Sequence, residues 1–477
     1  MKNDRLKPFI FIIFLIALTA AAMAYSSARV EPPVPATMGA GHHPFSQPGI
    51  VDISGHLVQR KILQGSEGIV NLSLTIHAGR LPEAASDESR SVDMVIVLDC
   101  SGSMKGRKIQ DAKSAISNLL TSLTANDRIA LIAYSEGVQK ISGLMSVSEK
   151  NRVNLESAIF RITAGGGTNL GAGLKAGIDT LLTATHTGSA GKVILISDGL
   201  ANKGITHPRQ LGNLAAIAAE KDFSVSTVGV GLEFNEYLMT TIADRGSGNY
   251  YYLENPAAFA ETFQKEFYYA KTSVATGICV QLPLEDGIDL VAAAGYPIKI
   301  QNNHAIFHPG DLRSGQTRKL FLSLRVPSAK ERRYEIGNIT LSYIHKGRSY
   351  QTAIEETFEI ACVRNNVEVY SSIDKTAWSQ KVIQEDFNRL KQEVAGDVKT
   401  GEKSRALARI KKYYMEKKSM NANVCSPEVS ENLNRDLKEL REVVEDTFQG
   451  EPTEVSRKQK SNSKLLQFNG YSGRRQQ

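Results

Sequence analysis

Short apolar runs that alternate with amphipathic segments between residues 91 and 266 constrain the fold of this chain more than any other feature. Such runs are typical of strands that are buried on both faces of a parallel sheet. They lie at Met94–Leu98, Ile129–Ala133, Val193–Ile196 and Phe223–Val228. The segments between them place apolar residues at helical spacing, at 108–123, 170–182 and 209–221. The alternation predicts a doubly wound, Rossmann-like α/β domain over 91–266.

The residues after this domain have the pattern of a β-sandwich. From 272 to 363, short alternating segments are punctuated by Pro and Gly, as at Ile278–Leu282 and Lys319–Val326. Residues 57–80 also alternate like strands, but the sequence around them offers no partner strands. We therefore expect 57–80 to complete the sandwich, with the α/β domain inserted between its strands.

The C-terminal part returns to helical periodicity. Residues 371–449 contain two apolar stripes, which predict the core of a small helical bundle or a surface that packs on a partner. The stripes are Trp378, Val382, Phe387, Leu390 and Val394, and Leu433, Leu437, Leu440, Val444 and Phe448. The polar residues 450–477 carry several Lys and Arg side chains, which indicates a basic flexible tail.

The first residues are those of an exported protein. Basic side chains precede an apolar run that ends in Ala22-Met23-Ala24, a small-x-small cleavage pattern. Residues 1–24 are therefore predicted to be a signal peptide, or alternatively an uncleaved N-terminal anchor, and 25–56 reads as a Pro- and Gly-rich linker. We expect a periplasmic, secreted or membrane-tethered protein that faces outside the cytoplasm.

Charge and cysteine content exclude some classes of protein. A formal net charge of +7 over 477 residues is modest and does not indicate a nucleic-acid partner. The chain has 4 cysteines, too few for a disulfide scaffold. Export permits disulfides, and Cys279 and Cys362, both in strand-like segments of the predicted sandwich, are the pair we would expect to be bonded.

Oxygen-bearing side chains follow the first and third of the buried strands. Asp99, Ser101 and Ser103 come directly after Met94–Leu98, and Asp198 follows Val193–Ile196. A glycine-rich loop with Thr168 lies between these two segments in the sequence. Because the carboxyl ends of parallel strands meet at one edge of the sheet, we expect these loops to converge there.

Asp-x-Ser-x-Ser, a distant Thr and a distant Asp-Gly resemble the metal-ion-dependent adhesion site of von Willebrand factor type A domains. The resemblance covers about 91–266. It implies that Ser101, Ser103 and Thr168 coordinate a metal ion directly, and that Asp99 and Asp198 do so directly or through water. The chain is similar, more loosely, to inter-α-trypsin inhibitor heavy chains and calcium-activated chloride channel regulators, which combine a type A domain with β-rich modules.

The chemistry of these five side chains supports a binding site. Hard oxygen ligands suit Mg²⁺, Mn²⁺ or, less well, Ca²⁺, whereas Zn²⁺ prefers nitrogen and sulfur. Because most of these ligands are neutral hydroxyls and few carboxylates touch the ion, it keeps net positive charge and an open position, which an Asp or Glu of a protein partner can fill. Alternatively, Ser103 could simply cap a helix and Asp198-Gly199 could be a plain turn. Cys100 is expected to be a small buried side chain.

Other chemistries have less support. The glycines of 171–177 follow a loop and lack an acidic partner, so they do not form a dinucleotide fingerprint. We therefore expect no enzyme, but a metal-dependent adhesion or assembly module. The alternative is a non-catalytic scaffold of a cell-envelope complex that uses its C-terminal helices, and a metal-dependent hydrolase is the third hypothesis.

Overall fold

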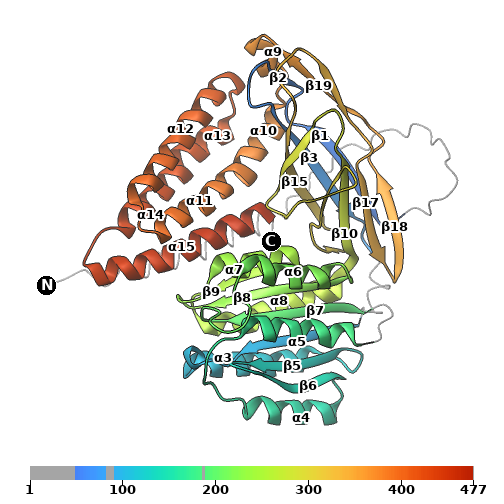
Figure 1. Ribbon diagram of the computed structural model, residues 1–477, viewed down its shortest axis with the longest axis vertical. Helices are drawn as coiled ribbons and strands as arrows, with labels where there is room; N and C mark the ends of the chain where they lie inside the picture. Colours follow the sequence, from blue (N-terminus) through green and yellow to red (C-terminus); the bar gives the residue numbers. More distant parts are fainter. Residues whose placement is uncertain (1–48, 82–90, 185–188, 476–477) are drawn as a thin grey trace. The chain divides into compact units, whose positions relative to one another are not determined.

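A computed structural model describes residues 49–81, 91–184 and 189–475 of the chain (Figure 1). The signal peptide or anchor predicted at 1–24 and most of the linker predicted at 25–56 lie outside these residues. Among the described helices, none combines the length and the apolar character that crossing a membrane requires.

The middle of the chain forms the predicted doubly wound α/β domain. Its sheet has the strand order β6-β5-β4-β7-β8-β9, which is the 3-2-1-4-5-6 order of Rossmann-like folds. Neighbouring strands run parallel except β5 and β6. The strands are β4 (Val92–Asp99), β5 (Arg128–Tyr134), β6 (Val138–Ser146), β7 (Ala190–Ser197), β8 (Phe223–Val230) and β9 (Ser247–Leu253).

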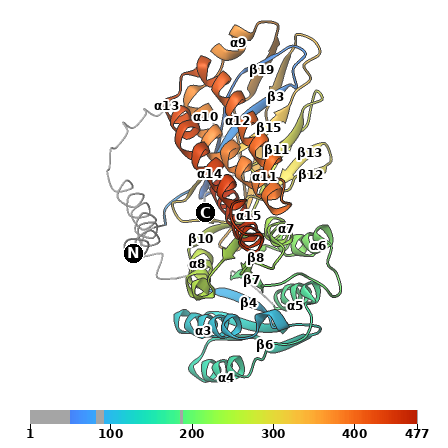
Figure 2. The same ribbon diagram turned by 90° about the vertical axis from the view of Figure 1, so that its left-hand side faces the viewer.

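Helices cover both faces of this sheet (Figure 2). The continuous apolar run of β4 explains why. Its residues alternate between two cores, with Met94 and Ile96 packed on one side and Val95 and Val97 on the other. One face carries α3 (Arg107–Ser122), α4 (Glu149–Phe160) and α8 (Phe259–Thr272), and the other carries α5 (Leu170–Leu182), α6 (Pro208–Ala219) and α7 (Glu236–Arg245).

The β-sandwich is built from strands on both sides of the α/β domain. β3 pairs antiparallel with β15 over most of its length, from Ile69 opposite Arg325 to His77 opposite Thr317. One sheet has the order β1-β3-β15-β11, and the other has β12-β13-β10-β17-β18 with β14 beside β10. The first sheet contains β1 (Val51–Leu57), β3 (Ile69–Ala78), β15 (Thr317–Arg325) and β11 (Asp289–Ala293).

The second sheet and a small third sheet complete this module. The second sheet contains β12 (Lys299–Gln301), β13 (His304–Phe307), β10 (Ser273–Pro283), β17 (Thr340–His345), β18 (Arg348–Ala353) and β14 (Leu312–Arg313). The third has the order β16-β19-β2, with β16 (Arg333–Ile336), β19 (Phe358–Val363) and β2 (Lys61–Leu63). Side chains of all three sheets share one apolar core.

Two predictions about this module are wrong. The linker does not extend to residue 56, because β1 begins at Val51, where it pairs with the end of β3. The proposed disulfide is absent, since Cys279 and Cys362 are both free thiols. They lie on β10 and β19, which belong to different sheets.

The helical region contains the two predicted stripes in its core. All members are buried except Phe448, which is partly buried. The helices are α9 (Asn366–Ser371), α10 (Lys375–Lys381), α11 (Phe387–Lys399), α12 (Lys403–Val424), α13 (Pro427–Glu431), α14 (Leu437–Thr447) and α15 (Pro452–Arg475), with π-helical turns at Val382–Asp386 and Asn432–Asp436.

The presence of α15 shows that the prediction of a flexible tail at 450–477 is wrong. Two of its apolar side chains are buried, with Leu466 7% and Tyr471 2% exposed, whereas Leu465 is 44% exposed. The ring of Tyr471 meets that of Tyr250 edge to face, with centroids 5.5 Å apart. Lys464 and Arg475 on this face pair with Glu236 and Asp244 of the α/β domain. Their charges are therefore neutralised by ion pairs although the side chains are buried.

Candidate metal-binding site

The candidate site lies where the direction of winding reverses. β4 and β7 are neighbours in the sheet, and the helices that follow them, α3 and α6, pack on opposite faces. Ligands of open α/β sheets bind at such a switch point, beside the carboxyl ends of the strands. Asp99 is the last residue of β4, and Asp198 follows the last residue of β7.

The loop after β4 carries two hydroxyl groups, and one of them contacts the carboxylate that follows β7. Ser101 Oγ lies 3.0 Å from Ser103 Oγ, which donates to Asp198 Oδ1 at 2.6 Å. The backbone N–H of Ser101 donates to Asp99 Oδ1 at 2.8 Å. The turn is a short 3₁₀ helix, Gly102–Met104, that separates β4 from α3. Three of the predicted ligands are therefore joined by a continuous chain of oxygen–oxygen contacts.

Helix capping does not account for these serines. The N-cap of α3 is Gly106, whose φ of 82° is favourable for glycine. Ser101 precedes the 3₁₀ turn but makes no side-chain capping hydrogen bond. The hydroxyl of Ser103 is directed at Asp198 instead. The structure thus favours a shared site over the alternative reading of separate local turns.

The loop that carries Thr168 is held against the other two. The N–H of Gly102 donates to the Gly166 carbonyl at 3.0 Å. The N–H of Thr168 donates to Asn202 Oδ1 at 2.9 Å. A Cβ atom on Gly199 would lie 3.2 Å from Ser103 Oγ and 3.8 Å from Thr168 Oγ1, so both hydroxyls face this glycine. All five predicted ligands therefore lie at one edge of the sheet.

The two carboxylates are buried and need positive charge. The side chains of Asp99 and Asp198 are both 0% exposed. Burial raises the pKa of Asp99, and the Asp198 charge adds to this rise against the hydrogen bonds from Ser101 and Ser197. Ser197 Oγ donates to Asp99 Oδ2 at 2.8 Å. A cation at this edge would relieve the cost of burying the two charges.

Within the described residues, one cation contacts these carboxylates. Lys108 Nζ lies 2.5 Å from Asp198 Oδ2. Two carboxylates and one ammonium leave a net negative charge, and the remaining groups are hydroxyl oxygens. Such a donor set fits a hard divalent ion. No group of three or more His, Cys, Asp or Glu side chains that could hold a metal occurs among the described residues.

Cys100 is not part of the donor set. Its side chain is buried, with 5% exposure, and belongs to the core between the sheet and α3. Burial, reinforced by the Asp99 charge, raises the pKa of its thiol to about 12. The thiol is therefore protonated at neutral pH, which is the inert behaviour expected of a structural cysteine.

Four neighbours of the site were not predicted. They are Lys108, Tyr134, Ser197 and Asn202. Tyr134 donates to the Ile196 carbonyl at 2.9 Å and lies 3.4 Å from Asp99 Oδ2. Ser197 directly precedes Asp198 and Lys108 lies in the first turn of α3, so nearness to the motif was an available signal. No sequence feature close to the motif indicates Tyr134, which lies at the end of β5.

The family comparison identifies the domain that carries the candidate site. The model of the von Willebrand factor type A domain matches residues 93–266. This part of the chain is a von Willebrand factor type A domain. The resemblance predicted from Asp99, Ser101, Ser103, Thr168 and Asp198 is thereby confirmed at the level of the domain.

Curated relatives match this chain over only part of their own length. An uncharacterized protein, YfbK of Escherichia coli (strain K12), is 30% identical over 199 residues, which cover 41% of this chain and 34% of that protein. Inter-alpha-trypsin inhibitor heavy chain H4 of Homo sapiens is 30% identical over 168 residues, which cover 34% of this chain and 18% of the relative. The chain thus spans less than two thirds of the length of these relatives.

Similarity to solved structures extends beyond the type A domain, as one of them shows. It is a von Willebrand factor type A protein from Catenulispora acidiphila, with a TM-score of 0.65 at 17% identity. The match covers 88% of this chain and 97% of that one. The two proteins therefore share the fold of most of the chain, and not only that of the type A domain.

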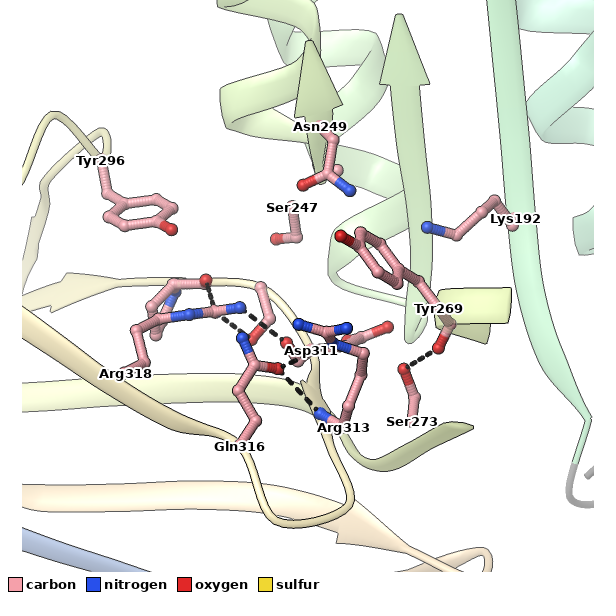
Figure 3. A pocket seen from close by; sticks show the side chains of 13 residues that line it. Lys192, Ser247, Asn249, Tyr269, Ser273, Tyr296, Asp311, Arg313, Gln316 and Arg318 are labelled. Carbon is pink, nitrogen blue, oxygen red and sulfur yellow. Dashed lines mark hydrogen bonds between the residues drawn. The ribbon is translucent and has the colours of Figure 1, made fainter. Parts of the chain in front are cut away.

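A second hollow lies at the opposite edge of the type A sheet (Figure 3). It is lined by residues near the starts of β7 and β9 and by the sandwich loop 309–318, and its volume is about 50 Å³. Its cations already have partners. Lys192 binds Glu266 at 2.7 Å, Arg313 stacks on Tyr269 at 4.3 Å, and Arg318 donates to the Asp311 carbonyl at 2.9 Å. We interpret this hollow as a polar junction between two modules.

Proposed function

We propose that this chain is a divalent-metal-dependent binding module, which captures an acidic residue of a protein partner through the type A domain. The observation that carries the proposal is the convergence of three hydroxyls and two buried carboxylates at the switch point, with one ammonium group beside them. This arrangement favours a bound cation. Because most of its ligands are neutral hydroxyls, the bound ion keeps positive charge.

Each residue has a role in this proposal. Ser101, Ser103 and Thr168 hold the ion through their hydroxyl oxygens. Asp99 and Asp198 hold it directly or through water, and Ser197 keeps one Asp99 oxygen oriented. The ion, which we expect to be Mg²⁺ or Mn²⁺ and less readily Ca²⁺, supplies an open coordination position for an outside carboxylate. An Asp or Glu of the partner fills that position.

The test compares cation-dependent binding in matched variants. Asp99→Ala and Thr168→Ala should abolish Mn²⁺ binding measured by calorimetry on the full chain, while circular dichroism stays that of the wild type. Asp179→Ala is the control, because it removes a carboxylate that pairs with Lys175 on the exposed surface of the same domain. Equal Mn²⁺ binding by wild type and Asp99→Ala would refute the site.

A scaffold role for the C-terminal helices is the second candidate. A groove of about 550 Å³ between α12 and α14 is mostly apolar and is lined by Leu407, Ile410, Tyr414, Leu433 and Leu437, among others. Grooves of this kind accept helices of partner proteins. Partner binding that survives EDTA but is lost in Tyr414→Asp would favour the scaffold. Loss in EDTA with no effect of Tyr414→Asp would favour the metal site.

We also propose that the protein is exported and is not an enzyme. Export rests on the N-terminal segment 1–24, and cell fractionation with N-terminal sequencing of the mature protein tests it. A binding role rests on the site itself, whose acidic groups are already engaged: Asp99 by Ser101 and Ser197, and Asp198 by Lys108. Mn²⁺-dependent turnover of ester or phosphoester substrates that is lost in Asp99→Ala would overturn the non-enzymatic assignment.

A further inference from the structure

Lys108 places a fixed positive charge inside the candidate metal site. Its Nζ lies 2.5 Å from Asp198 Oδ2 and 3.4 Å from the Ser103 carbonyl oxygen. The Asp198 side chain is 0% exposed and that of Lys108 30% exposed. An ion pair of this kind is only partly screened by water, unlike a pair on the surface.

The Lys108 side chain runs from the start of α3 past the loop that follows β8. Lys108 lies in the first turn of α3, five residues after Ser103. The end of its side chain passes close to Gly231, where a Cβ atom would meet Cε at 3.6 Å and Nζ at 3.7 Å. These are ordinary van der Waals distances, so the φ of 70° rather than the space explains the glycine at this position, which follows β8 directly.

The contacts divide the Asp198 carboxylate between two partners. Oδ1 accepts from the Ser103 hydroxyl, which is itself a predicted ligand, whereas Oδ2 accepts from Lys108. An ion held by the serines therefore approaches Asp198 from the Oδ1 side. The other oxygen, and part of the carboxylate charge, remain with the ammonium group.

From this division we propose that Lys108 is a built-in counter-cation, a positioning residue that weakens metal binding by the partner-free domain and keeps the bound ion electron-poor. The inference rests on the proposed function. In the metal-free domain, Lys108 neutralises Asp198 and so stabilises the fold. With metal bound, its charge repels the ion but attracts the carboxylate of a partner, so the site favours the ternary complex over the metal alone.

Lys108→Met tests the inference with the metal alone. Coulomb repulsion between charges a few ångströms apart near a protein surface amounts to about tenfold or more in affinity, so the variant should bind Mn²⁺ at least about tenfold more tightly by calorimetry. In EDTA the variant should melt at a lower temperature than wild type, because Asp198 is buried without a cation. The thermal shift produced by Mn²⁺ should therefore be larger in the variant.

Lys175→Met is the matched control. Lys175 also contacts an aspartate at 2.5 Å, but both members of that pair are exposed, so Mn²⁺ affinity and thermal shift should stay those of the wild type. Lys108→Gln is the second variant, since it can still donate a hydrogen bond to Asp198 without the charge. If Lys108→Met does not fold, tighter Mn²⁺ binding by Lys108→Gln carries the test.

The outcomes separate the two proposals. Mn²⁺ binding that is lost in Asp99→Ala but unchanged or weaker in both Lys108 variants would overturn the counter-cation and leave the metal site intact. Mn²⁺ binding that does not depend on Asp99 would overturn the proposed function itself, and the counter-cation with it.

Discussion

Substituting Lys464 by Met should weaken the docking of α15 on the type A domain. Lys464 Nζ lies 3.0 Å from Glu236 Oε2 and 2.9 Å from the Phe234 carbonyl oxygen. The side chains of Lys464 and Glu236 are 5% and 7% exposed. The substitution therefore leaves a carboxylate and a carbonyl in a buried place with one donor fewer each.

The size of the loss in docking free energy depends on the contacts that Glu236 and the Phe234 carbonyl keep in the variant. Removing one partner of a buried ion pair costs about 3–5 kcal/mol when the other charge is left uncompensated. Glu236 keeps Lys399, whose Nζ lies 2.7 Å from Oε1, so the electrostatic loss is smaller. The Phe234 carbonyl loses its donor, a cost of about 1–3 kcal/mol. We expect a loss of about 2–4 kcal/mol in the free energy of docking α15, partly offset because Met retains apolar contacts.

The loss should depend on pH with a defined sign. Burial acts to raise the pKa of Glu236, but the hydrogen bond from Lys399 and the charge of Lys464 outweigh it, and the pKa is lowered from its ordinary value of 4.5. A lowered carboxyl pKa stabilises the folded state above the unfolded pKa and ceases to do so as the pH falls through the folded one. The difference between wild type and Lys464→Met should thus be full at pH 7 and shrink below about pH 4.5.

Urea unfolding and amide hydrogen exchange of α15 measure the effect, and Lys460→Met is the control. Lys460 lies on the same helix and binds Glu233 at 2.8 Å, but these side chains are 48% and 63% exposed. An exposed pair contributes about 0–1 kcal/mol, so Lys460→Met should be nearly neutral. Equal protection of α15 in Lys464→Met and Lys460→Met would refute the claim that the buried pair anchors this helix.

Two further predictions concern packing and buried charge. Gly470→Ala should destabilise the fold by roughly 1–3 kcal/mol, because the new Cβ would lie 2.5 Å from a carbonyl oxygen of α11, whereas Gly396→Ala, with open space around it, should stabilise α11 by about 0.5–1 kcal/mol; urea unfolding compares them. Lys192→Met should cost about 3–5 kcal/mol at pH 7, because Glu266 is fully buried. In that variant the pKa of Glu266 should rise. The stability difference between wild type and variant, measured by thermal unfolding, should therefore be smaller at pH 5 than at pH 7, and larger above pH 7.

The parts of the fold that the sequence predicts well are those with a local signature. Continuous apolar runs identify β4, β5, β7 and β8, because strands buried on both faces leave no polar alternation. The motif that begins at Asp99 follows one such run, and Asp198 follows another. Sheet geometry then requires the two carboxylates to meet, so the candidate site could be assembled before any coordinates were known.

The parts that could not be predicted depend on countercharges that are distant in the sequence. In isolation, Lys464 and Arg475 look like solvated residues of a polar terminus, and the apolar content of 452–475 is too sparse to indicate burial. Their partners Glu236 and Asp244 lie on α7, more than two hundred residues earlier. Only the fold shows that basic residues on α15 and acidic residues on α7 neutralise one another.

The same reasoning explains why the charge balance of the candidate site emerges only from the structure. Lys108 is close to the motif in sequence, but its contact with Asp198 requires that β4 and β7 be neighbours. Gly231, which lies beside the Lys108 side chain, begins the loop between β8 and α7. Phe234 of this loop and Glu236, the first residue of α7, contact Lys464 of α15. Lys108 of the candidate site and Lys464 of α15 thus lie beside the two ends of one short loop. Because of this, Mn²⁺ affinity should be measured in Lys464→Met as well as in Lys108→Met: an unchanged value in the first variant would show that the loop is held by the sheet rather than by α15.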